Sequence, residues 1–402
     1  MKWVTLGTLV ALAWTLPGCG ASMGVTTGGA QDIGLARNQV AAGRIPTPDT
    51  FVIEGLLSEH DIDIRGPRCD KAFCLNIESA VAPALDTGED AAFLALGFSS
   101  GLKIDQFRRE PLNLAVVVDK SGSMQGDRIR AARAALEKLT RQLRDDDRIS
   151  LIFFDSRYEV VVPSTPVHRI KRRALWTAIG RLSAGGSTDI DSALAEGYAQ
   201  VARHSDDLRH DRVILITDAR PNTGRTEKGG FLELVGAGAD KGIGLTVMGV
   251  GLDFGHDLVM AISRTPGANY FYLEDAARLR TVFDEDFDLL VSPVAWDFEL
   301  LVHPTPGFRI TGAYGVPSWT EEEDHGRVRI HIPTLFLSRN RGAIVLRMEP
   351  DEGVKFTSDT PIGKGQLAYY PERGGTQEVS RLDVHVPRPG ASASKGVLDA
   401  VT

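Results

Sequence analysis

The sequence has 402 residues, which is long enough for two folded cores, because single hydrophobic cores stop growing at roughly 250–300 residues. Its 53 acidic and 45 basic residues give a formal net charge of -8 at pH 7. Binding to nucleic acid needs a clustered excess of Lys and Arg to neutralise phosphates, so this charge argues against a nucleic-acid partner.

The first residues are typical of an export signal. Lys2 precedes an apolar stretch over residues 3–16 that is too short for a stable transmembrane helix, and Leu16-Pro17-Gly18-Cys19 follows. This end resembles a bacterial lipoprotein signal, which implies that residues 1–18 are removed and that Cys19 is lipidated. We therefore expect an anchor in a membrane of the cell envelope, and Gly20 in place of Asp favours the outer membrane. The alternative is an ordinary signal peptide; both place the mature protein outside the cytoplasm.

The cysteine content agrees with export. Apart from Cys19, the chain has only Cys69 and Cys74. A zinc site would need two further soft ligands at matching spacing, and no His is close to this pair in sequence. We therefore expect a short-loop disulfide between Cys69 and Cys74.

The segment before the middle of the chain divides into two parts. Residues 19–48 are rich in Gly, Ala, Thr and Gln and have little periodic apolar pattern, so we expect a flexible tether. Residues 49–111 contain short alternating or apolar runs, such as 74–81 and 91–98, separated by Gly and Pro. This second part is predicted to be rich in β-strands.

Residues 112–291 have a different character, because apolar runs alternate with amphipathic helices. Residues 114–118 predict a fully buried strand, and residues 127–143 carry apolar side chains at helical spacing. Further strands are expected over residues 149–154, 213–217 and 245–250. The repetition predicts an α/β fold with a doubly wound, Rossmann-like sheet.

Strand-like segments return over residues 292–386, and residues 387–402 are rich in Ser, Gly, Ala and Pro, which predicts a disordered tail. The chain should enter the α/β domain near Leu112 and leave it near Leu290, both at the same end of the sheet. We therefore expect the flanks at 49–111 and 292–386 to form one β-sandwich into which the α/β domain is inserted.

Three polar loops lie in the α/β domain, and open α/β sheets bind ligands outside the carboxyl ends of their strands. Asp119-Lys120-Ser121-Gly122-Ser123 follows the first buried strand, residues 185–191 precede a helix, and Asp218 follows a later strand. Their donors are hydroxyl and carboxylate oxygens, which suit Mg²⁺, Mn²⁺ or Ca²⁺ rather than zinc. Two carboxylates are few for Ca²⁺, so Mg²⁺ suits the set best.

These loops resemble the metal-ion-dependent adhesion site of von Willebrand factor A domains, over residues 112–291. The closing strands resemble bacterial secreted members related to calcium-activated chloride channel regulators and inter-alpha-trypsin inhibitor heavy chains. The resemblance implies that serines ligate the metal directly, the threonine directly or through water, and the aspartates largely through waters. By position these residues are Ser121, Ser123, Thr188, Asp119 and Asp218. The resemblance also implies a protein partner that supplies an acidic group to the ion. Because Ser187 precedes Thr188, it stays open which of these two hydroxyls faces the ion.

The sequence favours a binding protein over an enzyme. Gly97-Phe98-Ser99-Ser100-Gly101 matches a hydrolase nucleophile elbow in letters, but that elbow needs a helix directly after the serine, and strand-like residues follow. Asp145-Asp146-Asp147 lies at a helix end and predicts a solvated turn rather than an acid/base pair. Two alternatives stay open: a structural or assembly module of an envelope complex that binds no metal, and a cytoplasmic A-domain co-factor of chelatases or ATPases, against which the signal segment argues.

Overall fold

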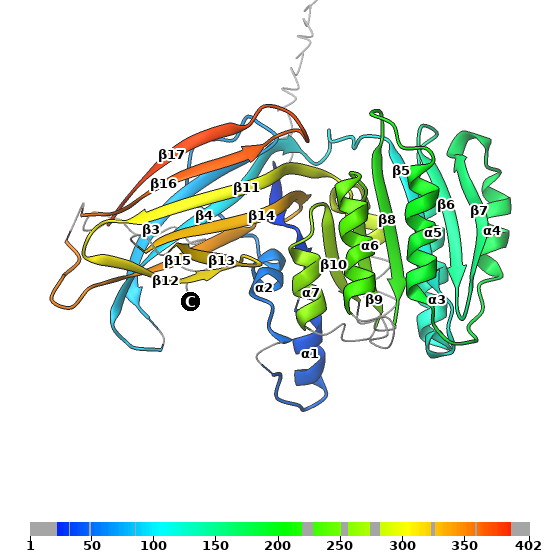
Figure 1. The fold of residues 1–402 in the computed structure, drawn as a ribbon, viewed down its shortest axis with the longest axis horizontal. Helices are drawn as coiled ribbons and strands as arrows, with labels where there is room; N and C mark the ends of the chain where they lie inside the picture. The colour runs from blue at the N-terminus through cyan, green and yellow to red at the C-terminus, as the bar shows by residue number, and fades with distance from the viewer. Residues whose placement is uncertain are drawn as a thin grey trace, which may run out of the picture.

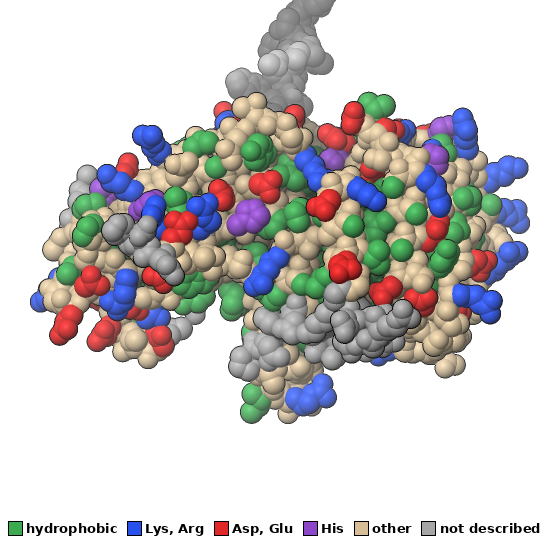
Figure 2. All heavy atoms as spheres, viewed as in Figure 1, with side chains coloured by type: hydrophobic (Ala, Val, Ile, Leu, Met, Phe, Trp, Pro, Cys, Tyr) green, Lys and Arg blue, Asp and Glu red, His purple; other side chains and the backbone are tan. Residues whose placement is uncertain are grey.

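The computed structural model describes residues 22–31, 33–47, 50–84, 86–218, 228–250, 256–273, 282–322, 326–357 and 360–386. The expected signal peptide, Cys19 and the tail at 387–402 lie outside these residues. Two β-sheets stand side by side, one covered by helices and one formed by strands alone (Figure 1). Acidic and basic side chains are interspersed over the face of both (Figure 2). In the described ranges, no helix is long and apolar enough to cross a membrane.

The α/β domain contains a seven-stranded sheet in the order β2-β10-β9-β8-β5-β6-β7. All neighbours pair in parallel except β6 and β7, which pair antiparallel. The strands are β2 (Gly29–Ala30), β5 (Leu112–Asp119), β6 (Arg148–Phe154), β7 (Tyr158–Pro166), β8 (His210–Thr217), β9 (Gly244–Val250) and β10 (Ala268–Leu273). The predicted doubly wound, Rossmann-like α/β fold is confirmed.

Helices cover both faces of this sheet. They are α3 (Asp127–Gln142), α4 (Arg172–Gly180), α5 (Ile190–Ala202), α6 (Lys228–Asp240), α7 (His256–Ser263) and α9 (Phe287–Leu290), with a π-turn at Val282–Asp286. Every residue of β5 is buried. Val116 and Val118 enter the core under α3, whereas Ala115 and Val117 enter the core under α5. A strand buried on both faces has no polar alternation, which explains its continuous apolar run.

The other sheet has ten antiparallel strands, and its main order is β12-β15-β4-β1-β14-β11-β16-β17. They are β1 (Ser22–Thr27), β3 (Cys74–Pro83), β4 (Asp90–Lys103), β11 (Pro293–Pro304), β12 (Phe308–Tyr314), β13 (Trp319–Glu322), β14 (Arg327–Ser338), β15 (Ala343–Pro350), β16 (Pro361–Tyr370) and β17 (Glu378–His385). Apart from β2, the strands of the α/β sheet lie between β4 and β11 in the chain.

The two flanks share one core, although they are hydrogen-bonded into a single sheet. In the pairing order β1 and β14 lie between β4 and β11, yet the rings of Phe98 on β4 and Phe298 on β11 are 5.5 Å apart. The sheet therefore curls over itself and encloses its core in the manner of a sandwich. A disulfide joins Cys69 to Cys74, the first residue of β3, and this is the pair that the sequence predicts.

The structure corrects the expectation of a flexible tether over residues 19–48. Residues 22–27 form β1, which pairs with both β4 and β14, and residues 34–41 form α1 (Gly34–Ala41). Met23 and Val25 are fully buried in the core of the antiparallel sheet. The small residues that suggested disorder instead permit close packing: a Cβ on Gly24 would lie 1.9 Å from the carbonyl oxygen of Asn340. The N-terminal flank at 49–111, which was predicted to be rich in β-strands, also contains a helix, α2 (Ile53–Glu59).

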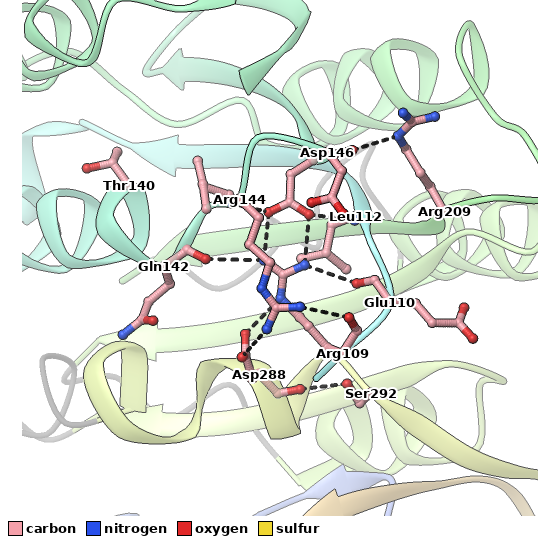
Figure 3. A network of polar contacts seen from close by, with 12 residues as sticks. Arg109, Glu110, Leu112, Thr140, Gln142, Arg144, Asp146, Arg209, Asp288 and Ser292 are labelled. Carbon is pink, nitrogen blue, oxygen red and sulfur yellow. Dashed lines mark hydrogen bonds and ion pairs between the residues drawn. The ribbon is translucent and has the colours of Figure 1, made fainter. Parts of the chain in front are cut away.

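A buried network of charges joins the two connections between the sheets (Figure 3). Arg109, in the segment entering the α/β domain, donates to both carboxylate oxygens of Asp147 at 2.6 and 2.7 Å. It also donates at 2.7 Å to Asp288, which lies in α9 just before the chain leaves the domain. Asp147 accepts further bonds from the backbone N–H groups of Leu112 and Arg144. The position of Asp147 at a helix end suggested a solvated turn. The structure corrects this expectation, because Asp147 is buried and forms an ion pair with Arg109.

Candidate metal centre

Three loops meet at the carboxyl ends of the parallel strands, along the lower edge of the α/β domain in Figure 1. The backbone N–H of Gly122 donates to the carbonyl of Gly186 at 3.0 Å, and that of Gly185 donates to the carbonyl of Lys120 at 2.7 Å. Because β5 and β8 are neighbours, Asp119 and Asp218 end at the same edge. The loops that the sequence singled out are thus in direct contact.

Asp119 lies at the base of the site and is fully buried. Its Oδ1 accepts from the backbone N–H of Ser121 at 2.7 Å, and its Oδ2 accepts from the hydroxyl of Thr217 at 2.6 Å. Burial raises the pKa of the Asp119 carboxyl above its ordinary value, although these hydrogen bonds oppose the shift. With both oxygens engaged, the carboxylate organises the turn that carries the serines.

Three oxygens lie next to one another above this base. The hydroxyl oxygens of Ser121 and Ser123 are 3.0 Å apart, and the Ser123 hydroxyl donates to Oδ1 of Asp218 at 2.7 Å. An octahedral Mg²⁺ with bonds of about 2.1 Å has neighbouring ligand oxygens about 3.0 Å apart. The spacing of these oxygens therefore fits adjacent positions around such an ion.

Thr188 lies two residues beyond Gly186, in the loop that contacts the serine turn. It is half-buried, whereas Ser187 is exposed. Within the described residues, no hydrogen bond joins the Thr188 hydroxyl to Ser121, Ser123 or Asp218. Four of the five expected donors are thus connected by hydrogen bonds, and Thr188 lies in the loop whose Gly185 and Gly186 contact the serine turn.

Two cationic side chains, Arg128 and Lys120, flank the site, and the sequence interpretation did not include Arg128. Arg128, in the first turn of α3, donates to Oδ2 of Asp218 at 2.5 Å and to the carbonyl of Ser123 at 3.2 Å. Lys120 forms an ion pair with Asp155, which follows β6, so its charge is compensated outside the serine turn. The local sequence offers one signal for Arg128: it lies in the first turn of the helix that follows the Ser121–Ser123 turn.

The described residues contain no group of three or more His, Cys, Asp or Glu side chains that could hold a metal ion. A cation at this edge would therefore depend on the serine hydroxyls as well as on carboxylates. Such a set suits a hard ion that keeps part of its water shell, which is the preference of Mg²⁺. The residues present fit this ion.

The nucleophile-elbow motif lies elsewhere and lacks the required geometry. Residues 97–101 all lie within β4, where Ser99 pairs with Cys74 of β3. No helix follows Ser99 in this described segment, and the strand continues to Lys103. The backbone turn that exposes a hydrolase nucleophile is absent here.

Comparisons with known proteins agree with this architecture. A family model, the von Willebrand factor type A domain, matches residues 113–285. A protein from Synechocystis sp. is 30% identical over 223 residues, which cover 55% of this chain and 52% of that protein. Protein YfbK of Escherichia coli is 25% identical over 299 residues, covering 71% and 50%. The chain thus spans about half the length of these bacterial relatives.

Inter-alpha-trypsin inhibitor heavy chain H1 of Mesocricetus auratus is 27% identical over 197 residues, which cover 47% of this chain and 21% of that protein. Among solved structures, a von Willebrand factor type A protein from Catenulispora acidiphila superposes with a TM-score of 0.53. The superposition covers 82% of this chain and 76% of that chain at 15% identity, so it shows a shared fold alone. Residues 113–285 thus match the von Willebrand factor type A domain, and the α/β domain of this chain has that fold.

Proposed function

We propose that this protein is an exported, lipid-anchored binding protein of the cell envelope whose A domain binds an acidic group of a protein partner through a divalent cation. The observation that carries the proposal is the contact of the Ser121, Ser123 and Asp218 oxygens at one edge of the sheet, at the spacing of an octahedral ion. Lipidation of Cys19 would tether the domain to a membrane, with the outer membrane favoured.

The roles follow from the positions of the side chains. Ser121 and Ser123 would hold Mg²⁺ directly, Thr188 would complete the set from the neighbouring loop, and Asp119 and Asp218 would balance its charge. The ion, when bound, supplies an open coordination position that accepts a carboxylate. This chemistry is recognition rather than bond breaking, so the proposal is a binding module and not an enzyme.

The surface supports a local mode of recognition. Acidic and basic side chains alternate over the face shown in Figure 2, so it offers no large field of one sign to attract a partner from a distance. The site also lies at the end of the parallel strands that is opposite to the Arg109 connection, so it is accessible while the antiparallel sheet is anchored.

Titration calorimetry of Mg²⁺ and Mn²⁺ into chelator-treated protein tests the metal proposal. We expect binding by the parent and its loss in Asp119→Ala and Ser121→Ala. Asp127→Ala is the matched control, since Asp127 is an exposed acid close to the same turn and pairs with the exposed Arg130. Comparing Thr188→Ala with Ser187→Ala shows which hydroxyl contributes. Absent binding in the parent, or equal binding in Asp119→Ala, would instead support a metal-free assembly module.

The anchor and the partner need separate measurements. We expect Cys19→Ala to move the protein from the membrane fraction to the soluble exported fraction, and density separation of the two membranes tests the outer-membrane assignment. A partner captured on the parent in Mg²⁺ should elute with EDTA and should not be captured by Asp119→Ala. Capture that is insensitive to EDTA would contradict recognition through the cation.

A further inference from the structure

A cavity of about 290 Å³ lies where the amino-terminal ends of β8 and β9 meet the antiparallel sheet. Its wall on the α/β side includes His210, Arg212 and Gly244, and its wall on the other side includes Trp296 of β11 and Arg373 of the turn between β16 and β17. The cavity is at the opposite end of the parallel strands from the Ser121 loop. We propose that it binds a small oxyanion, a carboxylate or a phosphate, through the buried guanidinium of Arg212.

Arg212 is a buried cation without a carboxylate partner. The residue is 3% exposed. Its Nη1 donates a hydrogen bond to the Thr246 hydroxyl at 2.8 Å, and its guanidinium lies 5.2 Å from the centre of the Phe336 ring. Within the described residues it forms no ion pair. Burial lowers its pKa to about 10, so it stays charged at neutral pH. An unpaired charge in the interior is strongly destabilising, and buried guanidinium groups are ordinarily matched by an anion.

The other buried arginines of the described residues follow that rule. Arg109 pairs with Asp147 and Asp288, and Arg347 pairs with Asp86 and Glu349. The same chain thus compensates its other buried guanidinium groups with two carboxylates each. Arg212 differs because its compensating anion is not part of the described chain, which is the arrangement of a ligand site.

Arg212 lines the cavity although only 3% of the residue is exposed. Nη2 of Arg212 lies against Gly244, where an added Cβ would be 2.9 Å from it, so the glycine lets the guanidinium pack closely against β9. Arg373 brings a second guanidinium to the rim: its Nη2 donates to the carbonyl of Ala239 at 2.7 Å, and its Nη1 lies beside Gly242. A planar guanidinium with free N–H groups matches a carboxylate or phosphate in two hydrogen bonds.

Four acidic residues also line the cavity, and none of them is paired with Arg212. Glu110 pairs with His210 at 2.9 Å, and Asp211 accepts from the Asn113 amide at 2.7 Å. Asp207 and Glu372 are exposed at the rim. The guanidinium of Arg212 is therefore buried, whereas the carboxylates of Asp207 and Glu372 are exposed at the rim, which favours a small anion over a large one.

Anion titrations of the full chain, with chelator present so that the metal centre is empty, test the proposal. Sodium phosphate and sodium acetate are each compared with sodium chloride at matched ionic strength, with thermal unfolding and tryptophan emission as readouts. We expect at least one of the two oxyanions to raise Tm and to change the emission of Trp296. Which of them acts identifies the source of the oxyanion.

Variants assign the response to this cavity. Arg212→Met should abolish both signals, Arg373→Ala should weaken binding several-fold, and Trp296→Phe should keep the Tm shift while losing the emission change. Arg203→Met, an exposed arginine outside the cavity, and Asp119→Ala should respond like the parent. If Arg212→Met does not fold, the oxyanion titrations of the parent and of Arg373→Ala test the proposal. A parent that responds to neither oxyanion, or undiminished binding in Arg373→Ala or in a folded Arg212→Met, overturns the proposal.

Discussion

Asp218 shows how one residue can serve two positive groups. Its Oδ1 accepts from Ser123, where a cation would bind, and its Oδ2 accepts from Arg128. The Asp218 side chain has no exposed surface, whereas Arg128 is 37% exposed, so the arginine neutralises a carboxylate that solvent does not reach. A cation and Arg128 then share the charge of Asp218, and each weakens the attraction that the carboxylate offers to the other.

Replacing Arg128 should therefore strengthen metal binding. We expect Arg128→Met to raise Mg²⁺ affinity about fivefold, the equivalent of about 1 kcal/mol for a partly exposed ion pair. Calorimetry of the two proteins measures the change, and Arg130→Met, which breaks only an exposed pair with Asp127, is the control. A fall in affinity would instead mean that Arg128 holds Asp218 in its binding position.

Glu54 gives the fold a pH dependence at the residue scale. Burial raises the pKa of this carboxyl from 4.5 to about 7. The folded state thus holds the proton more tightly than the unfolded state. The resulting stabilisation is complete below pH 4.5 and is lost as the pH rises to about 7.

Glu54→Gln removes this dependence because the amide does not ionise. We expect the free energy of unfolding of the variant to exceed that of the parent by about 2 to 3 kcal/mol at pH 8 and to equal it at pH 4.5. Urea unfolding at both pH values measures the difference. The exposed Glu89→Gln is the control, and a gain of equal size at both pH values would contradict the assignment.

At the scale of elements, β1 decides whether the antiparallel sheet is one unit. It fills the gap between β4 and β14, and the next two residues in strand form, Gly29 and Ala30, pair with β10 of the α/β sheet. A single short segment therefore takes part in both sheets. Its place is set by close approach of backbones, since the Cα of Gly24 lies against the turn that holds Asn340.

A side chain at Gly24 should separate these backbones. We expect Gly24→Ala to destabilise the protein by about 2 to 3 kcal/mol, because the obstacle is a carbonyl and not a flexible side chain. Thermal or urea unfolding measures the loss. Gly236→Ala in α6 is the matched control: an added Cβ there meets nothing within 4 Å, and alanine favours the helix by about 0.5 to 1 kcal/mol. Equal effects at both positions would contradict this account.

At the scale of the whole molecule, the inserted domain is held to its host by charges at its two connections. Arg109 and Asp288 belong to the entering and leaving segments, and Asp147 joins both to the turn before β6. The side chains of Arg109 and Asp147 are fully buried, and the Asp288 side chain is partly exposed. The network therefore fixes the orientation of the A domain while the metal edge stays at the other end of the sheet.

Breaking this network should affect stability without affecting the distant site. We expect Asp147→Asn to cost about 3 to 5 kcal/mol, because it leaves the guanidinium of Arg109 undercompensated in the interior. The neighbouring Asp146→Asn, at an exposed position, should be nearly neutral. Unfolding experiments measure both, and calorimetry should find unchanged Mg²⁺ affinity in Asp147→Asn wherever it is folded. A loss as large in Asp146→Asn would contradict the role of the buried pair.

The sequence by itself determined the features that depend on neighbours along the chain. Apolar periodicity identified the alternating strands and helices of residues 112–291, since burial of one helix face or both strand faces leaves a local pattern. The order of Asp119, Ser121 and Ser123 at a strand end placed a candidate metal centre, because every parallel strand ends at the same edge.

Only the tertiary structure decided which charges are compensated. Asp145, Asp146 and Asp147 are equivalent in sequence, yet Asp147 alone is buried against Arg109. The pairing of Arg128 with Asp218, the place of β1 in the sheet and the unpaired charge of Arg212 likewise join residues far apart in the chain. Charge pairing and close packing depend on distances in space, which local pattern does not contain, and these distances distinguish a solvated charge from a binding site.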